Sequence, residues 1–174
     1  MAGFQVLSNT LKLEEISMRI IAAVSLVALL AVSIWAQQRG PAATPGAATF
    51  FTAADVAGLI SKSPADRNAL GQRMLQVGPY NVNLEHRVVS QAASVHEKEA
   101  ELFYVIEGSG TVVTGGKLVG ESRTNETNLT GTSIEGGSSK KVNKGDWFMV
   151  PEGVPHQIPN VDGALSVMTL HLPR

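Results

Sequence analysis

The chain has 174 residues, a formal net charge of −1 and 44% hydrophobic residues, which is enough for one domain with a packed core. The near-neutral charge and the lack of a basic patch argue against nucleic acid as a partner. Because the sequence contains no cysteine, it excludes disulfides and thiolate metal sites, and any metal must be bound by histidine, carboxylate or neutral oxygen atoms.

The N-terminal region is typical of a secretory signal peptide. Arg19 precedes an apolar run over residues 20–35, and the small residue Ala36 offers a cleavage point. We therefore expect residues 1–36 to be a signal peptide region, with Met18 as an alternative start, and the mature protein to be periplasmic or secreted without membrane contact. The alternative is an uncleaved N-terminal anchor, although the run is at the short end of the length that a membrane span needs.

Two further segments precede the main domain. Residues 37–49 are rich in Ala, Gly and Pro without apolar periodicity, as in a linker. Residues 50–77 are predicted to be an N-terminal helical segment, because Thr52 and Asp55 have the spacing of a capping box before an amphipathic run. A second brief helical turn is expected over residues 67–75.

From residue 78 onward the sequence consists of short β-rich runs separated by glycine turns. Many short strands without a later helical pattern indicate an all-β sandwich or barrel over residues 78–174. The polar residues 121–133 are expected to form a loop or an exposed hairpin extension. Trp147, on a short apolar strand, is expected to lie in the core.

One motif follows that apolar strand near the C-terminus. Its spacing, G-x5-P-x-G-x2-H-x3-N, runs through Gly145, Pro151, Gly153, His156 and Asn160. The first proline ends the strand, and Gly153 is expected to take a positive φ. A rigid turn of this kind fixes the direction of the next side chain, the imidazole of His156. This spacing resembles the second signature motif of the cupin family, with every fixed position matched.

A second stretch, "SVHEKEAELFYVIEGSG", resembles part of the first cupin motif. His96 matches the second histidine of that motif, Glu101 its glutamate and Gly108 its closing glycine. Ser94 stands where the first histidine belongs, and Val88 where the first glycine belongs. The resemblance implies a double-stranded β-helix, the cupin jelly-roll barrel, with a short N-terminal helical segment.

The resemblance also implies a divalent metal inside the barrel, held by His96, Glu101 and His156. Independently of the family, two imidazoles and one carboxylate suit an iron site, and the same set would bind Mn, Ni or Zn. The hydroxyl of Ser94 is a weak ligand, so we expect it to hydrogen-bond a bound water. His86 and His171 are alternative replacements for the missing imidazole.

The neighbouring residues are interpreted from their position along the strand. By alternation Phe103 shares the face of Glu101 and is expected to line the lumen. Glu97 and Glu99 are interpreted as surface charges. Catalytic residues stay unassigned, because no separate general base is identifiable among Glu97, Tyr104 and His171.

The sequence thus predicts an exported metal-binding protein that binds or acts on a small organic molecule. If it is an enzyme, the resemblance allows a metal-dependent dioxygenase, isomerase or lyase. The alternative is a metal-free binding module for a sugar-like ligand, which the serine at position 94 favours. The resemblance also implies a homodimer.

Overall fold

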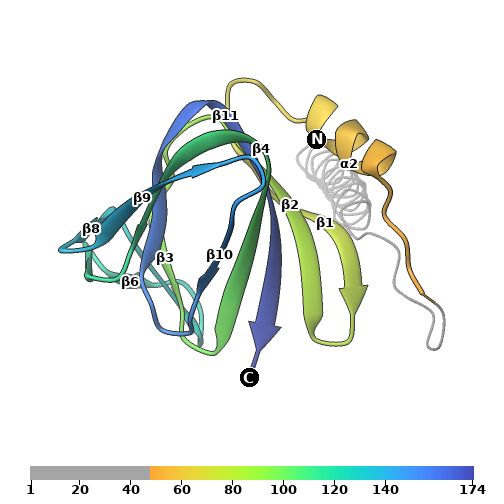
Figure 1. Cartoon of the computed structure of the whole chain (residues 1–174). Helices are drawn as coiled ribbons and strands as arrows, with labels where there is room; N and C mark the ends of the chain where they lie inside the picture. The colour runs from red at the N-terminus through yellow and green to blue at the C-terminus, as the bar shows by residue number, and fades with distance from the viewer. Residues whose placement is uncertain (1–47) are drawn as a thin grey trace, which may run out of the picture. The chain divides into compact units, whose positions relative to one another are not determined.

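The computed structural model describes residues 48–174, which form one α-helix and eleven β-strands (Figure 1). The predicted signal peptide, residues 1–36, and nearly all of the predicted linker lie outside the described residues. Within residues 48–174, no helix has the length and apolar character needed to cross a membrane.

The helical segment is shorter than the sequence pattern predicts. Helix α2 (Ala53–Ser61) begins at the expected capping box, in which Asp55 N–H donates to Thr52 Oγ1 at 3.2 Å and Thr52 N–H donates to the Asp55 carboxylate at 2.8 Å. The prediction of a second helical turn over residues 67–75 is wrong, because strand β1 (Ala69–Val77) occupies this region. Pairing with strand β2 (Tyr80–Arg87) satisfies its backbone and buries Met74, which overrides the local pattern.

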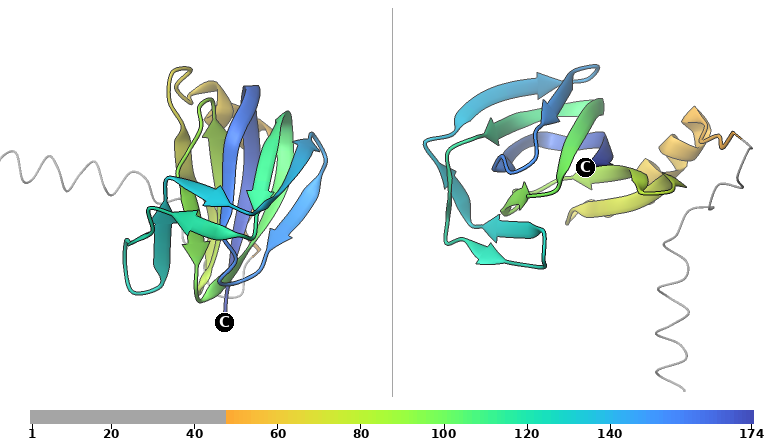
Figure 2. Two further views of the ribbon diagram at one scale, coloured as in Figure 1. Left: turned by 90° about the vertical axis from the view of Figure 1, so that its left-hand side faces the viewer. Right: turned by 90° about the horizontal axis from the view of Figure 1, so that it is seen from below.

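The remaining strands curl into a barrel, and β1 and β2 project to one side of it (Figure 2). The prediction of an all-β barrel is confirmed. These strands are β3 (Ala93–His96), β4 (Glu99–Thr114), β5 (Lys117–Val119), β6 (Ser122–Arg123), β7 (Asn128–Gly131), β8 (Ser133–Glu135), β9 (Ser138–Asn143), β10 (Trp147–Val150) and β11 (His156–Pro173).

Strands β4 and β11 pair along nearly their whole lengths and bend together over the upper end of the barrel (Figure 1). The bend depends on Gly108, whose φ is +78° and whose missing Cβ leaves room for the carbonyl oxygen of Ala164. Because of this bend, both ends of β11 return to the same, lower end of the barrel. That geometry brings residues that are far apart on one strand close together in space.

The middle of the barrel is filled by apolar side chains. Phe103 is 2% exposed and stacks on Phe148, with ring centroids 4.4 Å apart and planes at 7°. Phe103 therefore lies on the inner face, as alternation predicts. The buried cluster around it consists of Val105, Val112, Val142, Val150, Ile158, Leu165 and Val167. Burial of this cluster is the main stabilising contribution to the barrel.

The prediction that Trp147 lies in the core is wrong. Its side chain is 58% exposed and packs on Tyr104 of the neighbouring strand, with ring centroids 4.5 Å apart. Strand alternation explains the difference, because Phe148 and Val150 take the inner face of β10 and leave Trp147 and Met149 outside. Met149 is 54% exposed on the same outer face.

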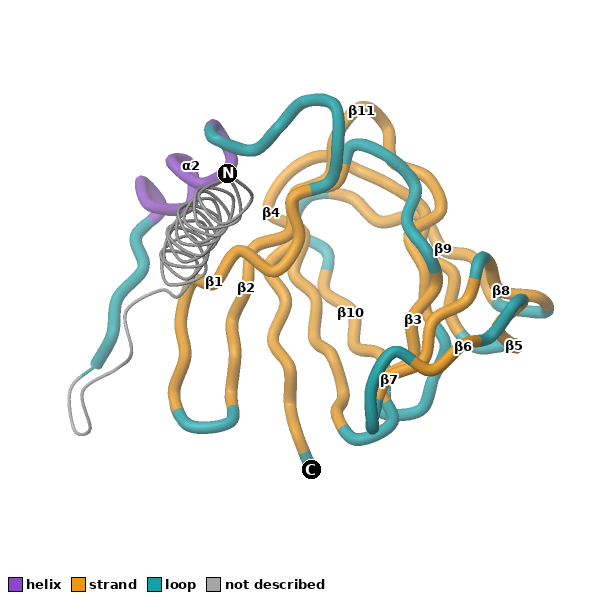
Figure 3. The backbone as a smooth tube through the Cα atoms, turned by 180° about the vertical axis from the view of Figure 1, so that it is seen from behind, coloured by secondary structure: helices purple, strands orange, loops and turns teal. Residues whose placement is uncertain are grey.

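The polar stretch over residues 121–133 is only partly a loop. It contains β6 and β7, which lie at one side of the barrel (Figure 3). Strand β7 pairs antiparallel with β3, and this register sets Asn128 opposite His96.

Candidate metal centre

Three imidazoles meet one carboxylate at the lower end of the barrel. Glu101 Oε2 lies 3.4 Å from His96 Nε2 and 3.2 Å from His156 Nε2. Its other oxygen, Oε1, lies 3.4 Å from His171 Nε2. The ring of His96 is central, because its centroid is 5.3 Å from the centroids of both His156 and His171.

Strand ends position all four groups. His96 closes β3, Glu101 lies near the start of β4, and β11 carries His156 as its first residue and His171 near its end. The register pairs His171 with Glu101 and His156 with Ser94. Because residues two apart share a face of a strand, Ser94 lies on the same side of β3 as His96.

The turn before His156 has the rigidity expected from its prolines and glycine. Gly153 has the expected positive φ, +71°, and its N–H donates to the carbonyl of His96 at 2.8 Å. The carbonyl of Pro155 accepts from Gly115 N–H, also at 2.8 Å. The turn is thus tied directly to the strand that carries the other motif histidine.

Each imidazole also has an acceptor at its second nitrogen. His96 Nδ1 lies 3.0 Å from Asn128 Oδ1, and His156 Nδ1 lies 3.3 Å from the carbonyl oxygen of Val154. His171 Nδ1 lies 3.1 Å from Glu99 Oε1. An acceptor at Nδ1 can hold the proton there and so leave the lone pair of Nε2 free to bind an ion beside Glu101. This is the arrangement that metal-binding histidines require.

The electrostatics of the cluster favour an ionised carboxylate. Burial acts to raise the pKa of Glu101, but hydrogen bonds with His156 and His96 outweigh it and hold this pKa well below the ordinary 4.5. Ionised Glu101 therefore contributes stability above pH 4.5 that is lost as the pH falls through its lower folded-state pKa. Burial acts to lower the pKa of His96, but hydrogen bonds with Glu101 and Asn128 raise it above 6.5.

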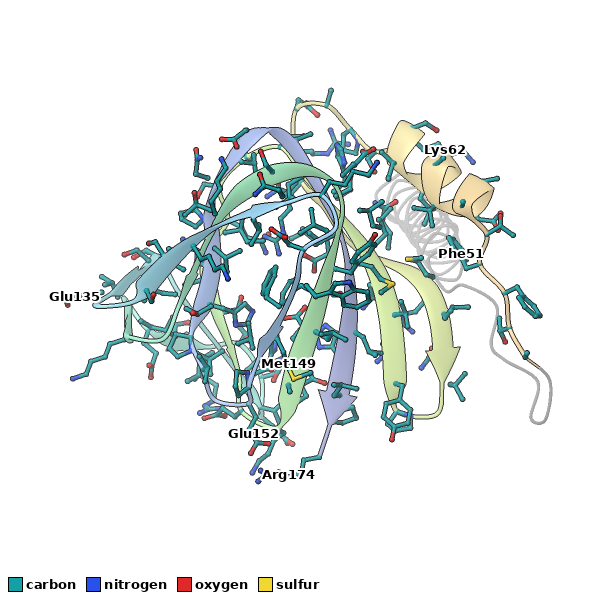
Figure 4. The ribbon with its side chains drawn as sticks, viewed as in Figure 1. Phe51, Lys62, Glu135, Met149, Glu152 and Arg174 are labelled. Atoms are coloured by element: carbon teal, nitrogen blue, oxygen red, sulfur yellow. The ribbon has the colours of Figure 1, made fainter. Side chains whose placement is uncertain are left out.

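The side chains of the cluster are only slightly exposed to solvent. The side chain of Glu101 is 5% exposed, whereas the three imidazoles are between 12% and 19% exposed. At the same end of the barrel, Glu152 forms an ion pair with Arg174 at 2.5 Å, and the two side chains lie together in Figure 4. Arg174 N–H also donates to the carbonyl of Lys98 at 3.1 Å.

A small cavity of about 20 Å³ adjoins the cluster on the side of Ser94. Its polar lining includes Arg87, Gln91, Ser94 and His156, and Phe103 with Phe148 forms an apolar wall. This volume is comparable to the space that one water requires. Ser94 therefore lines a space that one water could fill.

The structure brings the predicted ligands together and adds a fourth group. His96, Glu101 and His156 all belong to the cluster, and the ligand atoms of His96, Glu101 and His171 lie within 4.8 Å of one another. His86 does not belong to the cluster, because it is buried elsewhere with its Nδ1 2.9 Å from Ser166 Oγ. Two imidazoles with a carboxylate are a chemically suitable donor set for a divalent ion, so these residues fit a metal.

The interpretation of Glu99 as a surface charge is wrong, because its carboxylate contacts His171. Alternation was the signal that could have revealed this, since Glu99, Glu101 and Phe103 occupy the same face of β4. The interpretation holds for Glu97, which forms an ion pair with the exposed Arg123 at 2.7 Å. Asn128 was also missed, because it lies in a polar segment without a periodic pattern.

Comparison with protein families gives one assignment. Residues 57–171 match the model of a family described as Cupin. No curated protein matches the chain.

Solved structures with similar folds are distant in sequence. A Bacillus halodurans protein is 16% identical with a TM-score of 0.50, and the alignment covers 75% of this chain and 85% of that protein. A cupin superfamily protein from Desulfitobacterium hafniense is 14% identical, with a TM-score of 0.48 and coverage of 68% and 88%. A Klebsiella pneumoniae protein with a double-stranded β-helix domain is 13% identical, with a TM-score of 0.49 and coverage of 73% and 91%.

Proposed function

This chain belongs to the cupin family, and from that premise we propose that it holds a divalent metal ion among Glu101, His96 and His156 to bind or transform a small organic molecule. The observation that carries the proposal is the convergence of imidazole Nε2 atoms on one nearly buried carboxylate. The acceptor at each Nδ1 also supports the proposal, because metal-binding histidines have such partners. This favours the metal-bound form over the metal-free binding module.

The residues of the chain have separable tasks in this proposal. Glu101 supplies a negative charge that stays ionised at neutral pH. Asn128 and the carbonyl of Val154 orient His96 and His156, and the stacked pair of Phe103 and Phe148 excludes water from the barrel side. When bound, the ion supplies a Lewis acid that polarises an oxygen of the small molecule.

The test is the metal content of protein prepared without a histidine tag. After removal of metal with a chelator, titration with Fe, Mn, Ni or Zn should give about one ion per chain for at least one metal, because the folded barrel holds the ligands in place. His86→Gln is the matched control, since it changes a histidine outside the cluster and should bind equally. A content below about one tenth of an equivalent for all four metals would contradict the proposal.

We also propose that the protein is exported. The support is the basic residue, apolar run and small residue over residues 19–36, which lie outside the described part of the chain. Mass spectrometry of the protein purified from its native cells should show a mature chain that begins at Gln37. An intact N-terminus in the membrane fraction would identify the uncleaved anchor instead. The homodimer implied by the family stays a prediction.

A further inference from the structure

We infer that His171 is a fourth protein ligand of the metal, and that it replaces the imidazole that Ser94 lacks by entering from the last strand of the barrel. The inference rests on the proposed function, since it assigns a ligand to the same ion. It goes beyond the two sequence motifs, because His171 belongs to neither of them.

The position of His171 supports a ligand role. Its Nε2 lies 3.4 Å from Glu101 Oε1, on the carboxylate oxygen opposite to the one that His96 and His156 contact. Its ring stands nearly perpendicular to that of His96, at 75°, so that the two Nε2 atoms approach Glu101 from different directions. The strand register sets His171 directly opposite Glu101, which gives this approach a backbone cause.

Glu99 gives His171 the second contact that metal-binding histidines have. Glu99 Oε1 lies 3.1 Å from His171 Nδ1 and 3.9 Å from His96 Nδ1. A carboxylate at Nδ1 fixes the tautomer and the ring orientation and makes Nε2 a stronger donor. Glu99 is therefore a positioning residue, and Asn128 has the equivalent task for His96.

If His171 supplies the imidazole that position 94 lacks, the side of the ion next to Ser94 carries no imidazole. Ser94 is the strand partner of His156 and lines the small cavity beside it. With His171 bound from the opposite end of β11, the Ser94 side keeps a neutral hydroxyl and space for one water. We therefore expect an exchangeable ligand to bind on the Ser94 side.

The experiment compares wild type with His171→Ala, His156→Ala, Ser94→His and the double variant Ser94→His with His171→Ala. Metal affinity is measured by calorimetry with Zn, and the number of bound nitrogens by pulsed electron paramagnetic resonance with Cu(II). Wild type should show three coordinated imidazoles and His171→Ala two, with an affinity loss of at least about tenfold. Ser94→His should add one imidazole to either background and restore affinity in the double variant.

The outcomes separate this inference from the proposed function. If His171→Ala keeps wild-type affinity and nitrogen count while His156→Ala loses both, His171 is only a hydrogen-bond partner of Glu99 and the inference is overturned. If wild type binds no ion, the proposed function falls instead. Glu99→Gln should keep three imidazoles but weaken affinity by about tenfold, which a purely structural role of Glu99 would not produce.

Discussion

Replacing Glu101 by glutamine should lower the affinity for divalent metal by more than about 100-fold, beyond the loss expected for residues that only orient a ligand. Glutamine keeps nearly the same shape, so the barrel should still fold. It removes the negative charge that three imidazole nitrogens surround, and it places an amide where the ion needs an anionic oxygen. Calorimetry with Zn and Mn on metal-free protein measures the change directly.

Glu97→Gln is the matched control for this substitution. It makes the same chemical change four residues earlier, at a carboxylate that pairs with exposed Arg123. Its metal affinity should equal that of wild type within about twofold, since exposed ion pairs contribute little. Equal affinity of the Glu101→Gln variant and wild type would show that the carboxylate is not a ligand, provided that far-ultraviolet circular dichroism confirms a folded barrel.

Replacing Gly108 by alanine should destabilise the barrel by roughly 2–5 kcal/mol, through a positive φ and an overpacked contact. The φ of Gly108 is +78°, where a side chain is disfavoured, and an added Cβ would collide with the carbonyl oxygen of Ala164. The obstructing atom is backbone, so it cannot rotate away. Urea unfolding measures the loss as a lower free energy of unfolding.

Gly115→Ala isolates the contribution of the collision. Its φ is +76°, almost the same as that of Gly108, but an added Cβ would have no atom within 4 Å. This variant should lose only about 1–2 kcal/mol, the cost of the left-handed backbone alone. If both variants lose the same amount, the approach of Ala164 to Gly108 does not constrain the bend between β4 and β11.

The parts of the structure that sequence reasoning found are those with a local physical cause. The turn around Gly153 could be predicted because proline and glycine restrict the backbone wherever they occur. Phe103 could be placed because alternation needs only one reference residue, Glu101. The capping box at Thr52 likewise depends on residues three positions apart.

The parts that were missed depend on contacts between distant segments. The sequence of β1 has the pattern of a helical turn, and only its pairing with β2 makes it a strand. Trp147 lies on the outer face because its strand neighbours Phe148 and Val150 take the inner face. His171 could be named only as one alternative among several. Its place in the cluster follows from the bend of β11, which brings the end of that strand back beside His156 at its start. No local pattern contains this information.

The packed interior has a consequence for how related chains could change their ligands. Since aromatic and aliphatic side chains fill the middle of the barrel in the described part of the chain, we expect a small molecule to be recognised at the end where the metal cluster lies. At that end of the barrel Glu152 and Arg174 form an ion pair, and neither residue belongs to the buried cluster. Selectivity could therefore diverge through surface substitutions that leave the folding energy of the barrel untouched.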